Sequence, residues 1–281
     1  MIPDSRSAPV FLLECVDSTN DVLRQLAAEG VPAGTVLIAR RQTAGRGRMS
    51  RVFASPEGGL YLSVLEKPKM KPERISTVTP VAAIALLKTI EKMTGLSAGE
   101  GAKQVGIKWP NDVQIGGKKI CGILTELHTS MDPADADTPW HLIVGIGVNV
   151  NTSPEDLPPE LREIAGSIAE AADGKLDIDR FALSLIEEFD LLYQAWEAED
   201  PAVLRDYRKY CTTMGKDIFV IDTVQAMTSP EGSARRSAFV CGINDDFSLK
   251  VRYEDGSTGN VNSGEVSVRV RPGGGTENEY E

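Results

Sequence analysis

The sequence has 281 residues, of which 41% are hydrophobic and 25% are charged, and its formal net charge is −11. This composition is that of an ordinary globular protein with one large domain or two smaller ones. The sequence contains no apolar run of membrane-spanning length, and its first ten residues have no apolar core typical of a signal peptide. The acidic charge argues against a surface that coats nucleic acid. The four cysteines lie far apart in the sequence without a C-x-x-C pair, as is typical of reduced thiols. We expect a cytoplasmic protein with no membrane or nucleic-acid partner.

The chain begins with a predicted strand over Val10–Val16, followed by a predicted helix that ends near Gly30. Ser18, with Asp21 three residues later, is typical of a helix N-terminus. Capping is the simpler interpretation of Ser18. The exposed N–H groups of a helix N-terminus also bind anions and polar ligands, so a role in binding stays open.

A second predicted strand, residues 36–40, leads into the stretch Arg40–Phe53, which holds five arginines and no acid. Gly45 and Gly47 alternate there with Arg46 and Arg48. Glycine permits a close approach of the backbone to a ligand, and the arginine fork fits carboxylate or phosphate oxygens. The stretch therefore predicts a loop that wraps a small polyanion, with a solvated basic turn as the alternative.

The middle of the chain predicts further sheet strands around one buried helix. Strands are expected at residues 60–65 and 141–150, and a buried helix at 77–93. Residues 105–127 predict a hairpin with Gly116 and Gly117 at its turn. Lys108 ends the first run of this segment beside Trp109 and Pro110. An enclosed lysine requires an anionic partner, although a surface charge is the common fate of lysine. His128 and His141 flank a polar loop, and we expect no metal site.

The pattern changes near Pro201. An amphipathic helix is predicted at 181–197 and a short helix at 203–210, after which only short strands follow, at 218–221, 237–241, 249–253 and 265–270. These strands predict a small SH3-like barrel. We expect a first domain over residues 1–203, a second over 204–271, and a disordered tail over 272–281.

Six motifs occur in one order along the chain: D-S-T-N at 17–20, Q-T-A-G-R-G-R at 42–48, K-W-P-N-D at 108–112, G-I-L-T-E at 122–126, G-I-G-V-N-V-N at 145–151 and S-G-E-V-S-V-R at 263–269. Together they resemble a biotin protein ligase over about residues 10–270, the family that attaches biotin to carboxylases. The resemblance implies an α+β fold. Its catalytic domain is a mixed β-sheet flanked by helices, related to class II synthetases, and a small SH3-like β-barrel follows.

The resemblance also implies a role for each residue that matches a motif. The implied catalytic residues are Lys108 and Arg48, taken to meet the biotin carboxylate and the α-phosphate. The implied biotin-binding residues are Ser18, Thr19, Asn20, Gln42, Gly45, Arg46, Gly47, Arg48 and Lys108. The implied ATP-binding residues are Arg51, Phe53, Lys119 and Asn149. Two positions depart from the family, which commonly has glycine at Ser50 and tryptophan at Phe53.

The family reaction has two steps. Biotin and ATP, with Mg²⁺, give biotinyl-5'-AMP and pyrophosphate, and the biotinyl group then passes to a lysine of a biotin carboxyl carrier domain. A carboxylase such as acetyl-CoA carboxylase is the implied partner, and a homodimer is compatible with the family.

Three alternatives are considered. A lipoate ligase shares the fold and the chemistry, but the G-R-G-R and K-W-P-N-D pair argues against it. A biotin sensor without ligase activity is disfavoured by Lys108 and the loop arginines. A biotin-responsive DNA-binding repressor needs an added helix-turn-helix domain. The first core strand starts near Val10, so we expect a form without that domain.

Overall fold

The computed structural model of the chain describes residues 7–69, 72–75, 77–99, 101, 103–129, 140–222, 235–262 and 266–270. Its helices are α1 (Thr19–Ala28), α2 (Pro72–Ile75), α3 (Val78–Thr94), α4 (Ile168–Ala171), α5 (Ile178–Glu197) and α6 (Pro201–Tyr210). Its strands are β1 (Val10–Val16), β2 (Val36–Gln42), β3 (Leu60–Glu66), β4 (Val105–Lys108), β5 (Asp112–Ile115), β6 (Lys118–Thr129), β7 (Trp140–Val148), β8 (Asp217–Asp222), β9 (Arg235–Ile243), β10 (Leu249–Tyr253), β11 (Thr258–Val261) and β12 (Val266–Val270). Short 3₁₀ helices cover Arg48–Ser50 (η1), Pro154–Asp156 (η3) and Pro159–Leu161 (η4).

Strands β1 to β7 form one seven-stranded sheet in the order β1-β2-β3-β7-β6-β5-β4. β1 and β2 are parallel, with α1 as the crossover between them, and the other neighbouring pairs are antiparallel. The central strands β3 and β7 are almost entirely buried, because helices cover both faces of the sheet there. The sheet is therefore mixed, as the sequence predicts.

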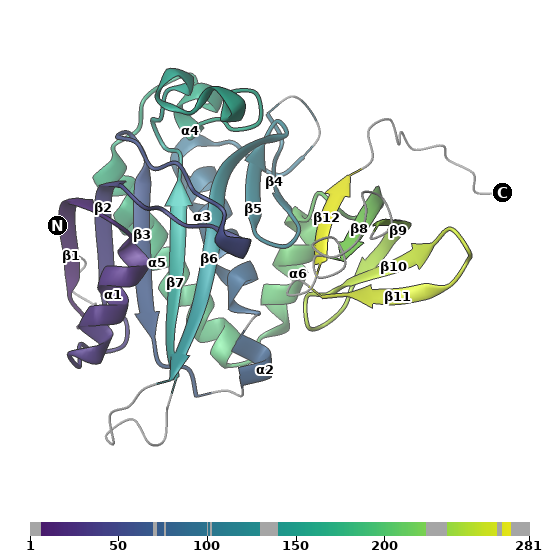
Figure 1. Cartoon of the computed structure of the whole chain (residues 1–281), viewed down its shortest axis with the longest axis horizontal. Helices are drawn as coiled ribbons and strands as arrows, with labels where there is room; N and C mark the ends of the chain where they lie inside the picture. The colour runs from purple at the N-terminus through teal and green to yellow at the C-terminus, as the bar shows by residue number, and fades with distance from the viewer. Residues whose placement is uncertain are drawn as a thin grey trace. The chain divides into compact units, whose positions relative to one another are not determined.

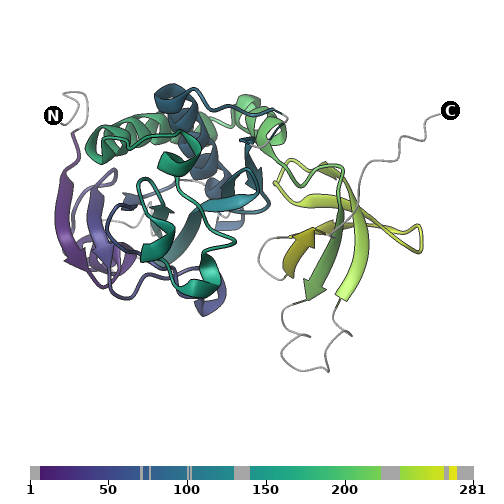
Figure 2. The same cartoon turned by 90° about the horizontal axis from the view of Figure 1, so that it is seen from above.

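Helices cover the two faces of this sheet differently (Figures 1 and 2). α3 and α5 pack side by side, and α3 contacts β4, β5, β6 and β7. α1 contacts β2, β3 and β7 and lies in front of the sheet in Figure 1, with α3 behind it. Leu23 and Ala27 of α1 form a buried apolar cluster with Leu37, Leu65 and Ile143 of the sheet. This cluster fixes α1 on the sheet, with Asn20 of its first turn directly over Gly145 of β7.

The sequences of α3 and α5 reflect their different surroundings. α3 is apolar around most of its circumference, since it lies between the sheet and α5. It ends at Gly95, whose φ of 74° is the left-handed conformation that commonly closes a helix. α5 begins at Asp177, whose carboxylate accepts hydrogen bonds from the backbone N–H groups of Asp179 and Arg180, both at 3.0 Å. Its buried face confirms the predicted amphipathic helix and includes Phe181, Leu185, Phe189, Leu192 and Trp196.

Strands β8 to β12 form a second, antiparallel sheet of five strands in the order β11-β10-β9-β8-β12. Alternate residues of these strands, such as Ile218, Val240 and Val251, form its buried side. The sequence did not predict β11, because T-G-N-V is polar and contains glycine. This segment is a strand because it pairs with β10 over Leu249–Arg252. The large mixed sheet with its helices and the small β unit confirm the predicted fold class.

The chain divides into two compact units, Met1–Tyr210 and Cys211–Glu281. The division follows Tyr210, whereas the sequence placed a boundary after Val203. The reason is that α6 contacts α3, α5 and β4 and so belongs to the first unit. The predicted tail, residues 272–281, and residues 263–265 of the last motif lie outside the described residues. Within the part of the chain that the structure describes, no helix combines the length and apolar character needed to cross a membrane.

The packing of α5 gives a stability prediction with a matched control on the same helix. Leu185 is fully buried, whereas Leu191 is 64% exposed. We expect Leu185→Ala to lower the free energy of unfolding by about 2–5 kcal/mol, because it leaves a cavity between α5 and its neighbours. Leu191→Ala should change it by no more than about 0.5 kcal/mol. Urea unfolding followed by circular dichroism measures both, and equal effects would contradict the orientation of α5.

Candidate functional site

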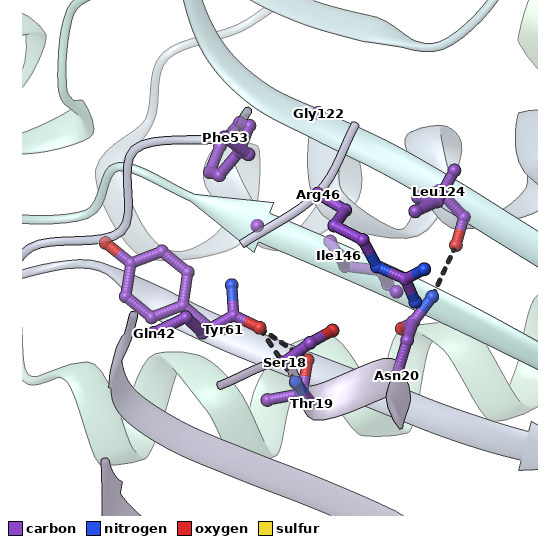
Figure 3. Close-up of a pocket in the computed structure, with 12 residues that line it drawn as sticks. Ser18, Thr19, Asn20, Gln42, Arg46, Phe53, Tyr61, Gly122, Leu124 and Ile146 are labelled. Atoms are coloured by element: carbon purple, nitrogen blue, oxygen red, sulfur yellow. Dashed lines mark hydrogen bonds between the residues drawn. The ribbon is translucent and has the colours of Figure 1, made fainter. Parts of the chain in front are cut away.

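A small pocket lies where the N-terminus of α1 meets the sheet (Figure 3). Its volume is about 30 Å³, which holds about two water molecules at the ~10–15 Å³ that each requires. The pocket is lined by Ser18, Thr19, Asn20, Gln42, Arg46, Phe53, Tyr61, Gly122, Leu124, Gly145, Ile146 and Gly147.

Glycines of β6 and β7 form the floor of the pocket. A Cβ atom on Gly145 would lie 2.3 Å from Oδ1 of Asn20, and one on Gly147 would lie 2.6 Å from Cε1 of Phe53. Gly122, the cross-strand partner of Gly147, would bring a Cβ within 3.0 Å of the same ring. The Asn20 amide and the Phe53 ring therefore lie directly on the sheet backbone, and only glycine permits this approach.

A buried network of hydrogen bonds holds one wall of the pocket. Oε1 of Gln42 accepts from the backbone N–H of Thr19 at 2.8 Å and from its hydroxyl at 3.1 Å. Nε2 of Gln42 donates to Oγ of Ser55 at 2.9 Å, and that hydroxyl donates to the carbonyl oxygen of Phe53 at 3.0 Å. A satisfied network of this kind fixes its members in one arrangement. It links the helix N-terminus to the returning side of the arginine-rich loop.

Ser63 is a buried polar residue that the sequence analysis did not select. Its hydroxyl oxygen lies 2.7 Å from Oγ1 of Thr19 and 2.6 Å from Oδ1 of Asn20. Nδ2 of Asn20 donates to the carboxylate of Glu126 at 2.7 Å. The only signal for Ser63 in the sequence is one hydroxyl within the otherwise apolar run at 60–65.

The structure gives Ser18 no capping role. Ser18 is the residue before α1, but its side chain makes no capping hydrogen bond. The residue is buried and lines the pocket. A role of Ser18 in ligand binding stays a prediction.

The arginine-rich loop folds back on itself beside this pocket. The N–H of Phe53 donates to the carbonyl of Gly45 at 2.9 Å, and the N–H of Gly47 donates to the carbonyl of Arg51 at 2.7 Å. A Cβ on Gly45 would lie 2.5 Å from the carbonyl oxygen of Phe53, so this turn requires glycine. Arg46 bonds two carboxylates, Asp21 of α1 at 2.9 Å and Glu126 of β6 at 3.2 Å.

The unusual backbone conformation in this loop occurs at Met49. Met49 has φ 57° and ψ 41°, a left-handed conformation that favours glycine. Ser50, where the resemblance leads us to expect glycine, has no positive φ. The departure at Ser50 therefore leaves the backbone unstrained at that position.

Lys108 lies on the same face of the sheet as the pocket but does not line it. Lys108 pairs with Asp112, Asp112 with Gly122, Gly122 with Gly147, and Gly147 with Tyr61. Directly opposite residues of antiparallel strands project from one face. Two strand spacings separate Lys108 from Gly122, which is about 10 Å.

Lys119 reaches this face through a bulge in β6. Val113 pairs with Cys121, and the next residue, Gln114, pairs with Lys119, which leaves Ile120 as an extra residue. Regular alternation would direct Lys119 away from the face of Gly122, but one extra residue restores it to that face. Nζ of Lys119 lies 2.6 Å from Oδ1 of Asp112. The cation is thus positioned next to the glycine floor.

Arg48 approaches the same carboxylate from the loop. Burial lowers the pKa of the Arg48 guanidinium from its ordinary value, the charge of Asp112 opposes this shift, and the charge of Arg51 adds to it. Arginine stays protonated even so. The charge of Asp112 therefore acts on two cations, Lys119 of the sheet and Arg48 of the loop.

Asn149, two residues after Gly147 of the pocket floor, carries an unsatisfied acceptor. Its N–H continues the ladder to the carbonyl of Ile120 at 2.8 Å, and its Nδ2 donates to the carbonyl of Gly166 at 3.0 Å. Its Oδ1 is buried and has no hydrogen-bond partner among the described residues. A buried acceptor without a partner is costly, so this atom suits a ligand that brings a donor.

Six of the residues selected from the sequence line the pocket: Ser18, Thr19, Asn20, Gln42, Arg46 and Phe53. Lys108 and Lys119 adjoin Asp112 on the same sheet face, and Arg48 belongs to the loop beside the pocket. Within the described ranges, no cluster of three histidine, cysteine or acidic residues could hold a metal ion.

Comparison with known proteins identifies related chains. Residues 12–168 match the model of the biotin/lipoate A/B protein ligase family. A Mycobacterium tuberculosis protein named biotin–[acetyl-CoA-carboxylase] ligase is 31% identical over 206 residues, which cover 72% of this chain and 71% of that protein. The bifunctional ligase/repressor BirA of Bacillus subtilis is 42% identical over 165 residues, which cover 58% of this chain and 47% of that protein. The chain thus spans about half the length of that relative.

Among solved structures, the biotin protein ligase from Aquifex aeolicus in complex with biotin and ATP is similar to this chain. The TM-score is 0.75 at 26% sequence identity, over 94% of this chain and 99% of that one.

The glycine floor gives a prediction for this site. Gly145→Ala should lower the free energy of unfolding by about 1–3 kcal/mol, because its Cβ displaces Asn20 from Ser63 and Glu126. Gly174, with no atom within 4 Å of an added Cβ and no positive φ, is the matched control. Gly174→Ala should change stability by no more than about 0.5 kcal/mol. Thermal unfolding of both variants measures the difference, and a neutral Gly145→Ala would contradict the contact with Asn20.

Proposed function

Because this chain belongs to the biotin/lipoate A/B protein ligase family, we propose that it activates biotin with ATP and transfers the biotinyl group to a lysine of a biotin carboxyl carrier domain. One observation carries this proposal. A pocket walled by hydroxyl and amide groups adjoins, on the same sheet face, the cations Lys119, Arg48 and Lys108. Such a site receives a neutral polar ring at one end and anionic groups at the other.

The walls of the pocket suit biotin better than lipoate. The fused rings of biotin carry a urea group with N–H donors and a carbonyl acceptor, whereas the dithiolane ring of lipoate carries neither. Ser18, Asn20 and Gln42 line the pocket and surround it with hydroxyl and amide groups. A polar lining of this kind suits a urea group better than an apolar dithiolane ring.

The cations account for the first chemical step. A carboxylate oxygen of biotin attacks the α-phosphorus of ATP, a new P–O bond forms, and the bond to pyrophosphate breaks. Both reactants are anions, so fixed positive charge must offset their repulsion and stabilise the charge that develops on the α-phosphate. Lys108 is proposed to contact the carboxylate and the α-phosphate, and Arg48 to bond the phosphate of the adenylate. Mg²⁺ is proposed to arrive with the ATP phosphates.

The base of ATP is proposed to bind near Phe53 and Asn149. The ring of Phe53 lies flat on the glycines of the floor and can stack on a base. The unpaired Oδ1 of Asn149 accepts from an exocyclic amine, a donor that adenine carries. Arg51 and Lys119 are proposed to meet the phosphates.

In the second step, the amine of the acceptor lysine attacks the carbonyl carbon of biotinyl-5'-AMP, an amide bond forms, and AMP leaves. The adenylate is a mixed anhydride and must be protected from water until the acceptor arrives. The loop from Gly45 to Arg48 is proposed to open for substrates and to close over them, which agrees with the small volume of the pocket. The cytoplasmic location, the homodimer and the lack of a nucleic-acid partner stay predictions from the sequence.

The function is tested by mass spectrometry of an isolated biotin carboxyl carrier domain after incubation with this protein, ATP, Mg²⁺ and biotin. We expect one biotinyl group on one lysine, together with release of pyrophosphate. Lipoate in place of biotin, and omission of ATP, serve as controls. Modification by lipoate but not by biotin would establish the lipoate ligase instead, and biotin binding without pyrophosphate release would establish a sensor.

Lys108→Ala should lower the rate of biotin-dependent pyrophosphate release roughly 10²- to 10³-fold, the usual effect of removing one charged group from a stabilised transition state. Circular dichroism should show an intact fold. Lys103→Ala, which removes a lysine paired with Asp173 at the surface, serves as the control and should keep the wild-type rate. A wild-type rate in Lys108→Ala would refute the proposed role of Lys108.

A further inference from the structure

Asp112 is an acid in a place where the proposed reaction requires positive charge. It begins β5 and pairs directly with Lys108 on one side and with Gly122 of the pocket floor on the other. Its side chain therefore projects from the face that holds the pocket. An anion here repels phosphate, so its presence needs a reason that outweighs this repulsion.

The contacts of Asp112 supply that reason. Oδ1 of Asp112 lies 2.6 Å from Nζ of Lys119, and both side chains are partly buried, at 27% and 37% exposure. Lysine has a long flexible side chain whose ammonium is a point charge without fixed direction. A carboxylate at this distance restricts the ammonium to one region of the sheet face.

Backbone pairing on both sides of Lys119 supports its contact with Asp112. The bulge at Ile120 turns Lys119 toward Asp112. The N–H of Lys119 donates to the carbonyl of Ile164 at 2.8 Å, and the N–H of Gly166 donates to the carbonyl of Lys119 at 3.0 Å. The Lys119 backbone is therefore held between β5 and the segment before α4, and its side chain is directed by Asp112.

The charge of Asp112 also acts on the guanidinium of Arg48, which Arg51 repels. One carboxylate thus pairs with a cation of the sheet and acts electrostatically on a cation of the loop. Without Asp112, neither cation would have this compensating negative charge.

We propose that Asp112 is a positioning residue for adenylate formation, which holds the ammonium of Lys119 beside the glycine floor where the α-phosphate of ATP reacts. Asp112 contacts no substrate in this role and acts through Lys119. The inference rests on the proposed function, because it takes pyrophosphate release as its measure. It adds a residue to which the sequence analysis gave no role.

The test is a double-mutant cycle on the rate of biotin-dependent pyrophosphate release, with Asp112→Asn, Lys119→Met and both together. Asp112→Asn should lower kcat about tenfold to hundredfold, because a displacement of about 1 Å in a reacting group has effects of that size. The KM values for biotin and ATP should change less than about threefold, since ground-state binding is largely kept. Asp112→Asn should have little further effect when Lys119 is already Met.

Two variants separate positioning from a general structural role. Asp112→Glu keeps the carboxylate and should recover most of the lost rate. Asp173→Asn removes a similar contact, 2.6 Å from Nζ of Lys103, at a place outside the pocket, and should keep the wild-type kcat. Thermal unfolding of each variant shows how much of the protein is folded, and rates are compared per folded molecule.

The outcomes distinguish this inference from the proposed function. A wild-type protein that releases no pyrophosphate with biotin refutes the proposed function itself. An active wild type with an unchanged kcat in Asp112→Asn overturns the positioning role. Additive effects of the two substitutions also overturn it, because Asp112 would then act independently of Lys119.

Discussion

The site depends on one steric constraint, which is the close approach of side chains to the backbone of β6 and β7. Gly122, Gly145 and Gly147 leave the sheet without side chains at its centre, so Asn20 and Phe53 lie directly on the strands. The N-terminus of α1 and the returning side of the arginine-rich loop can therefore meet over the same few residues. Larger residues at the floor would push these two segments apart. The hydroxyl, amide and guanidinium groups that the segments carry would then no longer lie close together.

Electrostatic contacts then decide how the loop lies on this floor. The protein is acidic overall, yet its loop is strongly basic. Arg46 bonds Asp21 and Glu126, and the charge of Asp112 acts on Arg48. Asp21 and Glu126 come from α1 and β6, so the ion pairs of Arg46 attach the loop to two separate elements of the scaffold. These pairs are partly exposed and each contributes modestly. Added salt weakens such contacts, and anionic substrates compete for the same arginines.

The sequence predicted those features of the structure that depend on residues close together along the chain. The motifs implied the fold class through the family resemblance, the glycines and arginines of residues 40–53 predicted the loop, and periodicity predicted most of the helices and strands. Ser63 was missed because its role comes from contacts with residues 44 and 43 positions away. The position of Lys119 depends on a bulge, which strand pairing creates and alternation does not reveal. β11 has no apolar pattern of its own and exists only through its pairing with β10.

The bulge at Ile120 divides β6 into two segments whose alternation is out of phase. After it, the even-numbered residues Gly122, Leu124 and Glu126 face the site, whereas before it the odd-numbered Lys119 does. The positions of β6 that tolerate polar substitution should therefore switch between odd-numbered and even-numbered residues at Ile120. Deleting this one residue would remove the bulge but leave Lys119 two positions before Gly122, on the same side of the sheet. Keeping all residues and losing the bulge would instead turn the lysine to the opposite side, so the pairing register, and not only residue identity, determines which charge the site contains.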